Sequence, residues 1–123
     1  MADIKKNLED LWERIIKTCE KVKRKKEEIE IVAISKGVEV EKIKEAINCG
    51  VNKIGENRVQ EALKKIPLIE NEFKNIEWHF VGHLQTNKVK KAIKYFSVIQ
   101  SVDRISLAEE LQKEAQKANK IIK

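Results

Sequence analysis

Hydrophobic positions along the chain follow two different periods. From Ile4 to about Glu28, apolar residues recur at steps of three and four, which predicts one long amphipathic helix. Ile31 to Ile34 is instead a short, continuous apolar run rich in β-branched residues, as expected for a strand buried on both faces. The chain should therefore open with a long helix that is followed by a buried strand.

Strands and helices then alternate through the rest of the chain. The pattern predicts further strands over 51–54, 77–81 and 97–100, and the segment 120–123 resembles the beginning of a fifth strand. Helices are expected between the strands: 40–49, ended by Gly50; 57–65, broken by Pro67; 68–74; 89–96, capped by Thr86 or Asn87; and 105–118.

This alternation is typical of βαβ units and a parallel sheet, so the fold class is α/β. Two architectures fit, an open doubly wound sheet and a (β/α) barrel of TIM type. The first strand-to-helix turn, Ser35 to Glu39, has neither a G-x-G-x-x-G nor a P-loop signature, which disfavours a dinucleotide or triphosphate site there. The pattern favours the barrel without excluding the open sheet.

Composition and charge narrow the functional classes. The 123 residues are 41% hydrophobic and 37% charged, with a net charge of +6 that would attract anions such as nucleic acid, a membrane surface or phosphorylated small molecules. The lysine excess after Gln85 fits either a solvated helix surface or a phosphate-attracting face. Diffuse charge, 5% aromatic residues and no recognised motif argue against nucleic acid. With no signal sequence and no apolar run of membrane-spanning length, we expect a cytoplasmic protein without a membrane partner.

Lys36 has the most distinctive position for chemistry. In parallel α/β folds the functional groups lie beyond the carboxyl ends of the strands, and Lys36 directly follows the first apolar strand. Desolvation there would favour the neutral amine, which is the nucleophile that imine formation requires. The alternative is a lysine whose ammonium group extends into solvent from a strand end.

Other polar residues also follow predicted strands. Asn57 can direct its amide at a ligand or cap the helix that begins there, and Arg58 can bind a phosphate or an acidic neighbour on its own helix. His83, with Gln85 close by in sequence, is well placed for a ligand, whereas His79 is more typical of a hydrogen-bonded core histidine. With two histidines and no cysteine or carboxylate at matching spacing, no metal site is expected.

Four segments of the chain, each at a strand end and in the right order, resemble the pyridoxal phosphate homeostasis protein family: Val32–Lys36, Gly55–Glu61, Trp78–Lys88 and Ser101–Arg104. That family shares its fold with the N-terminal barrel of alanine racemase, and the match covers essentially the whole chain. The resemblance therefore implies a single domain, residues 1–123, that forms the N-terminal half of a TIM-type barrel, about four βα units preceded by a long helix.

The resemblance also implies a cofactor and its site. Lys36 is expected to hold pyridoxal 5'-phosphate as a Schiff base, and Asn57, His83 and Gln85 to line the cofactor pocket. Family members are cytosolic carriers or regulators of vitamin B6 and amino-acid balance, so a non-catalytic protein is expected. A racemase-like enzyme is the alternative; it needs a second acid–base group, and the only tyrosine, Tyr95, lies on a predicted helix away from the strand ends.

Two departures from the family change these expectations. In the family, the lysine is usually followed by Thr-x-Pro. In this chain Lys36 is followed by Gly37, Val38 and Glu39, which should loosen the turn. Family members are also nearly twice as long, and their second half supplies the phosphate grip and an arginine facing the pyridine nitrogen. A half-barrel with open strand edges should associate, as a homodimer that completes the barrel, unless the chain is a truncated fragment without cofactor binding.

Overall fold

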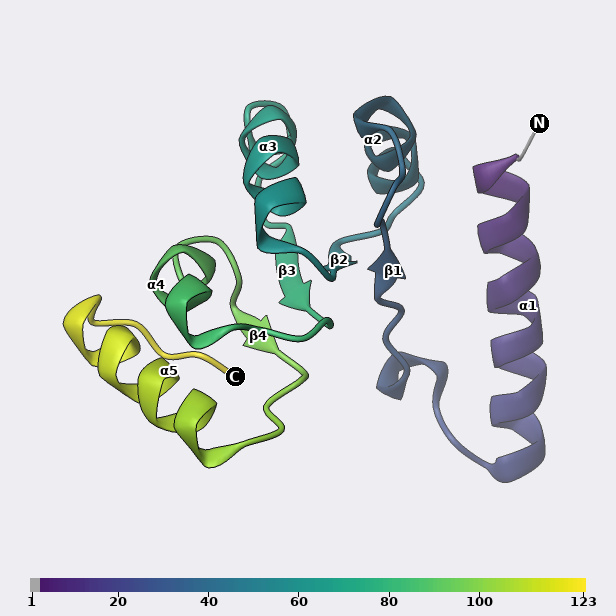
Figure 1. The fold of residues 1–123 in the computed structure, drawn as a ribbon. Coiled ribbons are helices and arrows are strands. Elements are labelled where there is room, and N and C mark those ends of the chain that lie inside the picture. The colour runs from purple at the N-terminus through teal and green to yellow at the C-terminus, as the bar shows by residue number, and fades with distance from the viewer. Residues whose placement is uncertain (1–2) are drawn as a thin grey trace.

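The computed structural model describes residues 3–123, in which helices line one side of a parallel sheet (Figure 1). The elements within this range are α1 (Ile4–Val22), a 3-10 turn η1 (Lys26–Glu28), β1 (Ala33–Ile34), α2 (Val40–Asn48), β2 (Lys53–Glu56), α3 (Val59–Glu70), β3 (Glu77–Phe80), η2 (Thr86–Lys88), α4 (Val89–Ala92), β4 (Val98–Ile99) and α5 (Ile105–Lys117).

The strand order decides between the two predicted architectures. All four strands run parallel in the order β1-β2-β3-β4, so each strand pairs with its neighbour in sequence. A doubly wound sheet reverses its strand order at a switch point, whereas a barrel adds strands in succession. Helices α2 to α5 follow the strands along the same side (Figure 1). The described chain is therefore a half-barrel, and the barrel prediction is confirmed.

The end of the chain adds to the open edge of β4. The Ile99 amide donates to the carbonyl of Lys123 at 2.8 Å, and the Lys123 amide donates to the carbonyl of Ser97 at 3.0 Å. These two bonds are the beginning of a parallel ladder. They agree with the prediction that the last residues begin a fifth strand, although only Lys123 is paired.

The core lies between the sheet and the helices. The backbone register aligns Ala33, Ile54 and Trp78 on one face of the sheet, and Ile54 and Trp78 are almost fully buried there. The rings of Phe80 and Phe96 meet edge to face, with centroids 5.2 Å apart. The predicted inner face of the helix after β3 is confirmed, since these four residues are all buried: Val89, Ala92, Ile93 and Phe96.

The opposite face of the sheet is open and partly polar. The register aligns Ile34 with Gly55, His79 and Val98, and the Ile34 side chain is 52% exposed. The prediction that the first strand is buried on both faces is therefore wrong, because only the helix-facing side of the sheet is covered. His79 is buried, as expected, through hydrogen bonds of its two ring nitrogens to Glu77 and Gln100.

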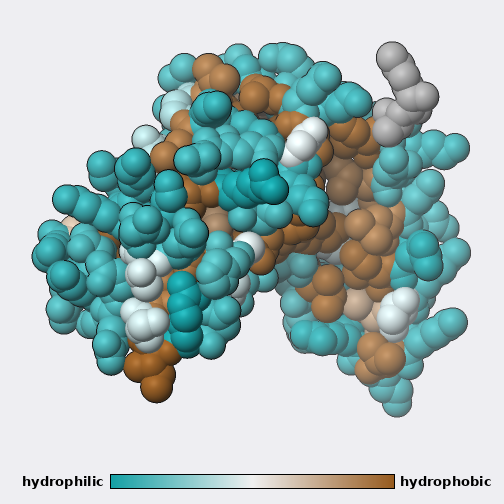
Figure 2. Space-filling model, in the orientation of Figure 1, coloured by the Kyte–Doolittle hydropathy of each residue, from teal (hydrophilic) through white to brown (hydrophobic). Residues whose placement is uncertain are grey.

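An apolar groove separates α1 from the sheet. It is lined by residues of α1, such as Leu8 and Leu11, and by Ile34, Val38 and Ile43 on the opposite side, with a volume of about 360 Å³. Figure 2 shows hydrophobic side chains gathered between α1 and the rest of the molecule. The apolar stripe of α1 is therefore only partly covered.

Several predicted boundaries are wrong for local reasons. Helix α1 ends at Val22 and not near Glu28, because Lys23 adopts a left-handed conformation with φ 58°. Strand β2 covers Lys53–Glu56, since Gly55 pairs with both neighbouring strands and does not end the strand. No side chain caps η2 or α4, so the predicted capping by Thr86 or Asn87 is also wrong. Gly50, with φ 105°, follows α2 as predicted.

Pro67 does not break its helix. Helix α3 continues through it to Glu70, so the separate helix predicted over 68–74 is absent from the described chain. A proline inside a helix costs about 3 kcal/mol. Ile66 and Ile69, on either side of Pro67, are fully buried in the core, and their burial offsets that cost. Within residues 3–123, no helix is both long and apolar enough to cross a bilayer.

Candidate functional site

Three of the predicted site residues meet at one cleft beyond the carboxyl ends of β2 and β3. Asn57, His83 and Gln85 line a cavity of about 430 Å³. Arg58 and Lys88 lie at the same cavity and give it positive charge, and the remaining lining residues are Val59, Gln60, Phe80 and Leu84. The convergence expected from their places in the sequence is therefore present in the fold.

The loop after β2 and the loop after β3 touch through their backbones. A Cβ placed on Gly82 would lie 2.3 Å from the Asn57 carbonyl oxygen, so only glycine permits this approach. Asn57 does not cap α3; Arg58 occupies the cap position, and no side chain accepts a hydrogen bond there. The capping alternative for Asn57 is thus wrong, and its Oδ1 is buried without a hydrogen-bond partner among the described residues.

The segment after β4 holds the His83–Gln85 loop in place. The Ser101 hydroxyl donates to the Gly82 carbonyl, and the Arg104 guanidinium donates to the Leu84 carbonyl at 2.5 Å. Arg104 also binds Asp103 at 2.6 Å, and this hydrogen bond lowers the pKa of the Asp103 carboxyl. Ser101 and Arg104 therefore act on the cleft through the backbone of the neighbouring loop.

Lys36 does not line this cleft. It occupies the turn after β1, is exposed, and is not among the residues that line the cavity. The Ser35 side chain is directed toward Glu56, whereas Ile34 lies on the open face of the sheet. The Lys36 side chain is exposed, so the predicted desolvation of its amine is wrong for residues 3–123.

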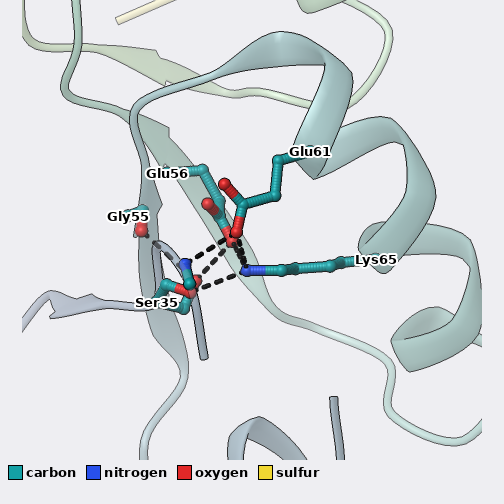
Figure 3. A network of polar contacts seen from close by, with 6 residues as sticks. Ser35, Gly55, Glu56, Glu61 and Lys65 are labelled. Carbon is teal, nitrogen blue, oxygen red and sulfur yellow. Dashed lines mark hydrogen bonds and ion pairs between the residues drawn. The ribbon is translucent and has the colours of Figure 1, made fainter. Parts of the chain in front are cut away.

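A buried network anchors the turn that carries Lys36 (Figure 3). The Lys65 ammonium group donates to the Ser35 carbonyl at 2.7 Å, to Glu56 Oε1 at 3.0 Å and to Glu61 Oε1 at 2.7 Å. The Ser35 hydroxyl donates to Glu56 Oε1 at 2.6 Å, and the Gly37 amide donates to Glu61 Oε1 at 2.7 Å. Both residues that flank Lys36 are thus fixed to β2 and α3.

The conformation of the turn favours glycine. Gly37 has φ 69°, and the Val38 amide donates to the Ser35 carbonyl at 3.0 Å, which closes a four-residue turn with glycine in its third position. The turn bond and the bond to Glu61 both restrain Gly37, and a turn looser than one with Thr-x-Pro stays a prediction.

The network sets the protonation of its members. Burial lowers the pKa of Lys65, but hydrogen bonds and charge from Glu61 and Glu56 outweigh it, so the pKa is raised overall. The hydrogen bond from Lys65 lowers the pKa of Glu61, with a smaller effect from the Gly37 amide. Lys65 is thus held as an ammonium ion with its three N–H donors engaged, and it is unsuited to nucleophilic attack.

The sequence pattern does not reveal this network. Glu61 and Lys65 lie four residues apart on a helix, a spacing that normally indicates a surface ion pair. Glu56 ends a strand, and only its complete burial shows that it serves as an internal acceptor. The one available signal was an acidic residue two positions beyond the predicted strand 51–54.

The fold and site together define the class of protein. It is a parallel α/β protein of barrel type, of which this chain forms half a barrel, with polar groups at the carboxyl ends of its strands.

No family model matches the sequence. Curated relatives named pyridoxal phosphate homeostasis protein occur in Aquifex aeolicus, at 46% identity, and in Haemophilus influenzae, at 33%. Both alignments cover 91% of this chain, but 48% and 47% of the relatives. The resemblance to this family is confirmed, and the chain spans about half the length of the curated relatives it matches.

Solved structures support the same relationship. A protein of unknown function from Bifidobacterium adolescentis superimposes with a TM-score of 0.87 at 29% identity, over 94% of this chain and 51% of that one. PipY from Synechococcus elongatus, solved with PLP bound, superimposes with a TM-score of 0.71 at 38% identity, over 74% of this chain and 42% of PipY. The half-barrel described above is therefore shared with longer proteins.

The contact between the two site loops predicts that replacing Gly82 by alanine costs more stability than replacing Gly55. Gly82→Ala places a methyl group against the Asn57 backbone, which cannot easily move, and should destabilise the chain by about 2 kcal/mol. In Gly55→Ala the methyl group comes too close only to the tip of Ile34, which can rotate on the open face, and makes ordinary contacts with Val32 and Val81, so the cost should stay below about 1 kcal/mol. Urea unfolding of both variants checks this order, and equal costs would contradict it.

The lowered pKa of Glu61 predicts how the network depends on pH. Such a carboxylate stabilises the folded chain above its unfolded pKa, ordinarily 4.5, and this contribution is lost as the pH falls through the lower folded value. The stability lost in Glu61→Gln should therefore be constant near neutral pH and shrink below pH 4.5. Urea unfolding across this range measures it, with Glu109→Gln on α5 as control; a loss that grows toward acid pH would refute the assignment.

Proposed function

We propose that this chain is a cytoplasmic, non-catalytic pyridoxal 5'-phosphate-binding protein that takes part in vitamin B6 and amino-acid homeostasis, with Lys36 as the residue that bonds to the cofactor. The observation that carries the proposal is an exposed lysine, fixed at the end of the first strand, in a chain 46% identical to a pyridoxal phosphate homeostasis protein. The PLP-bound structure of PipY, 38% identical to this chain, supports the cofactor assignment.

The residues present suit such a cofactor. The bound cofactor supplies an aldehyde to the site, and condensation with the Lys36 amine forms a carbon–nitrogen double bond, a Schiff base, with loss of one water. Asn57 brings a buried amide oxygen without a partner among residues 3–123, and His83 and Gln85 bring polar groups at the rim. Arg58 and Lys88 give the same cleft the positive charge that attracts a phosphorylated molecule.

The position of Tyr95 favours a carrier over a racemase-like enzyme. Racemisation requires acid–base groups on both faces of the bound amino acid. Tyr95 follows α4 and packs partly against the core that lies between the sheet and the helices, away from the carboxyl ends of the strands. This tyrosine therefore cannot act opposite Lys36.

Replacing Lys36 tests the cofactor proposal. Ultraviolet–visible titration of the 123-residue chain with pyridoxal 5'-phosphate should produce the absorbance band of a protonated Schiff base, and borohydride reduction followed by peptide mapping should locate the label on Lys36. Lys36→Ala should lose this band, whereas Lys42→Ala, which removes an exposed lysine of α2, should retain it. A band of equal strength in Lys36→Ala would show that another lysine binds the cofactor.

We also propose that residues 1–123 act as one domain and that a second copy covers the open face. In residues 3–123, β1 pairs along one edge only, with β2. Ile34 is half exposed, and an apolar groove lies beside it. Unpaired strand edges and exposed apolar surface favour association, and two half-barrels related by a two-fold axis supply the missing strands.

The dimer proposal predicts both a mass and a variant that changes it. Size-exclusion chromatography with light scattering should give twice the chain mass of 14.3 kDa. Ile34→Asp places a charge on the open face and should convert the dimer to a folded monomer. Ile105→Asp changes a residue that is 77% exposed at the start of α5 and should remain dimeric. A monomeric, well-folded parent chain would refute the proposal.

A further inference from the structure

The turn that carries Lys36 is held by contacts on both sides of the lysine. On the N-terminal side, the Ser35 carbonyl accepts from Lys65 and the Ser35 hydroxyl donates to Glu56. On the C-terminal side, the Gly37 amide donates to Glu61. All three partners belong to β2 or α3, and the carboxylates of Glu56 and Glu61 meet at the Lys65 ammonium group (Figure 3).

The cluster has properties that stability alone does not explain. Glu56 is fully buried, its Oε2 has no hydrogen-bond partner among residues 3–123, and Lys65 is 9% exposed. Removing the Glu56 carboxylate and the Lys65 ammonium group from water costs several kcal/mol per ion, and well-packed apolar residues of similar volume often serve stability as well or better. What the charged cluster adds is a directional restraint on the Ser35–Gly37 backbone.

We propose that Lys65, acting with Glu56 and Glu61, is a positioning residue that fixes the direction in which Lys36 presents its amine. This inference rests on the proposed role of Lys36. Lys65 does not itself touch the cofactor; it holds the backbone on both sides of Lys36 and so restrains the direction of the lysine side chain. Without Lys65, the Ser35 carbonyl loses one partner and the two carboxylates face each other without a cation.

Competition among lysines of the same molecule tests this proposal. The 123-residue chain is treated with limiting pyridoxal 5'-phosphate, reduced with borohydride and mapped, and the label on Lys36 is divided by the label on exposed Lys42. Lys65→Met should lower this ratio about five-fold or more, the factor expected for loss of one hydrogen bond. Lys64→Met removes the adjacent exposed lysine with the same change in charge and should leave the ratio unchanged.

The acceptor of the Gly37 amide provides a second, milder pair of variants. Glu61→Ala removes this acceptor and should lower the labelling ratio, whereas Glu61→Gln retains an oxygen for Gly37 and should restore part of it. These variants decide the question if Lys65→Met does not fold. An unchanged ratio in a folded Lys65→Met or Glu61→Ala chain would overturn the proposal.

Amide hydrogen exchange separates this inference from the proposed function. If Lys36 is not labelled preferentially in the parent chain, the cofactor assignment fails, but the restraint on the turn can still be measured. The Gly37 amide should exchange about ten-fold faster in Lys65→Met than in the parent, while the Ala62 amide inside α3 keeps its rate. Equal Gly37 rates in the two chains would overturn the positioning role.

Discussion

A single ammonium group ties together the first two strand ends and the helix that follows them. The Lys65 side chain uses its three N–H donors on the Ser35 carbonyl, Glu56 and Glu61, and each acceptor belongs to a different part of the chain. Because an ammonium group buried without partners would be very costly, the three segments are restrained to one arrangement. The backbone around Lys36 is determined by this interaction.

The rest of the site depends on similar backbone restraints. The Asn57 carbonyl lies so close to Gly82 that no side chain fits between them, and Ser101 and Arg104 hold the carbonyls of Gly82 and Leu84. Each loop at the carboxyl edge is therefore positioned by the loop or helix next to it. Side chains of these loops that face the cleft are therefore held in position, although the loops are not part of a helix or strand.

The two faces of the sheet explain how this chain relates to its longer relatives. The helix-facing side contains a complete core with fully buried Trp78 and Phe80, which is consistent with an ordered half-barrel. The opposite side exposes Ile34 and carries the polar row of Lys53, Glu77, His79 and Gln100. The chain aligns with about half of each relative, so this face of the sheet lies where a complete barrel would enclose its interior.

The sequence alone determined the order of the strands and the helix-facing core, because both follow from local periodicity. It also determined that Asn57, His83 and Gln85 lie at strand ends, because this follows from the direction of parallel strands.

Tertiary structure decided which side chains are buried and where one helix ends, because local patterns do not contain this information. Pro67 stays inside α3 because Ile66 and Ile69 are buried around it, and Lys65 faces inward because two carboxylates and a carbonyl meet there. Lys36 is exposed although it follows an apolar strand, because burial depends on what covers a face of the sheet, and that is a property of the assembled fold.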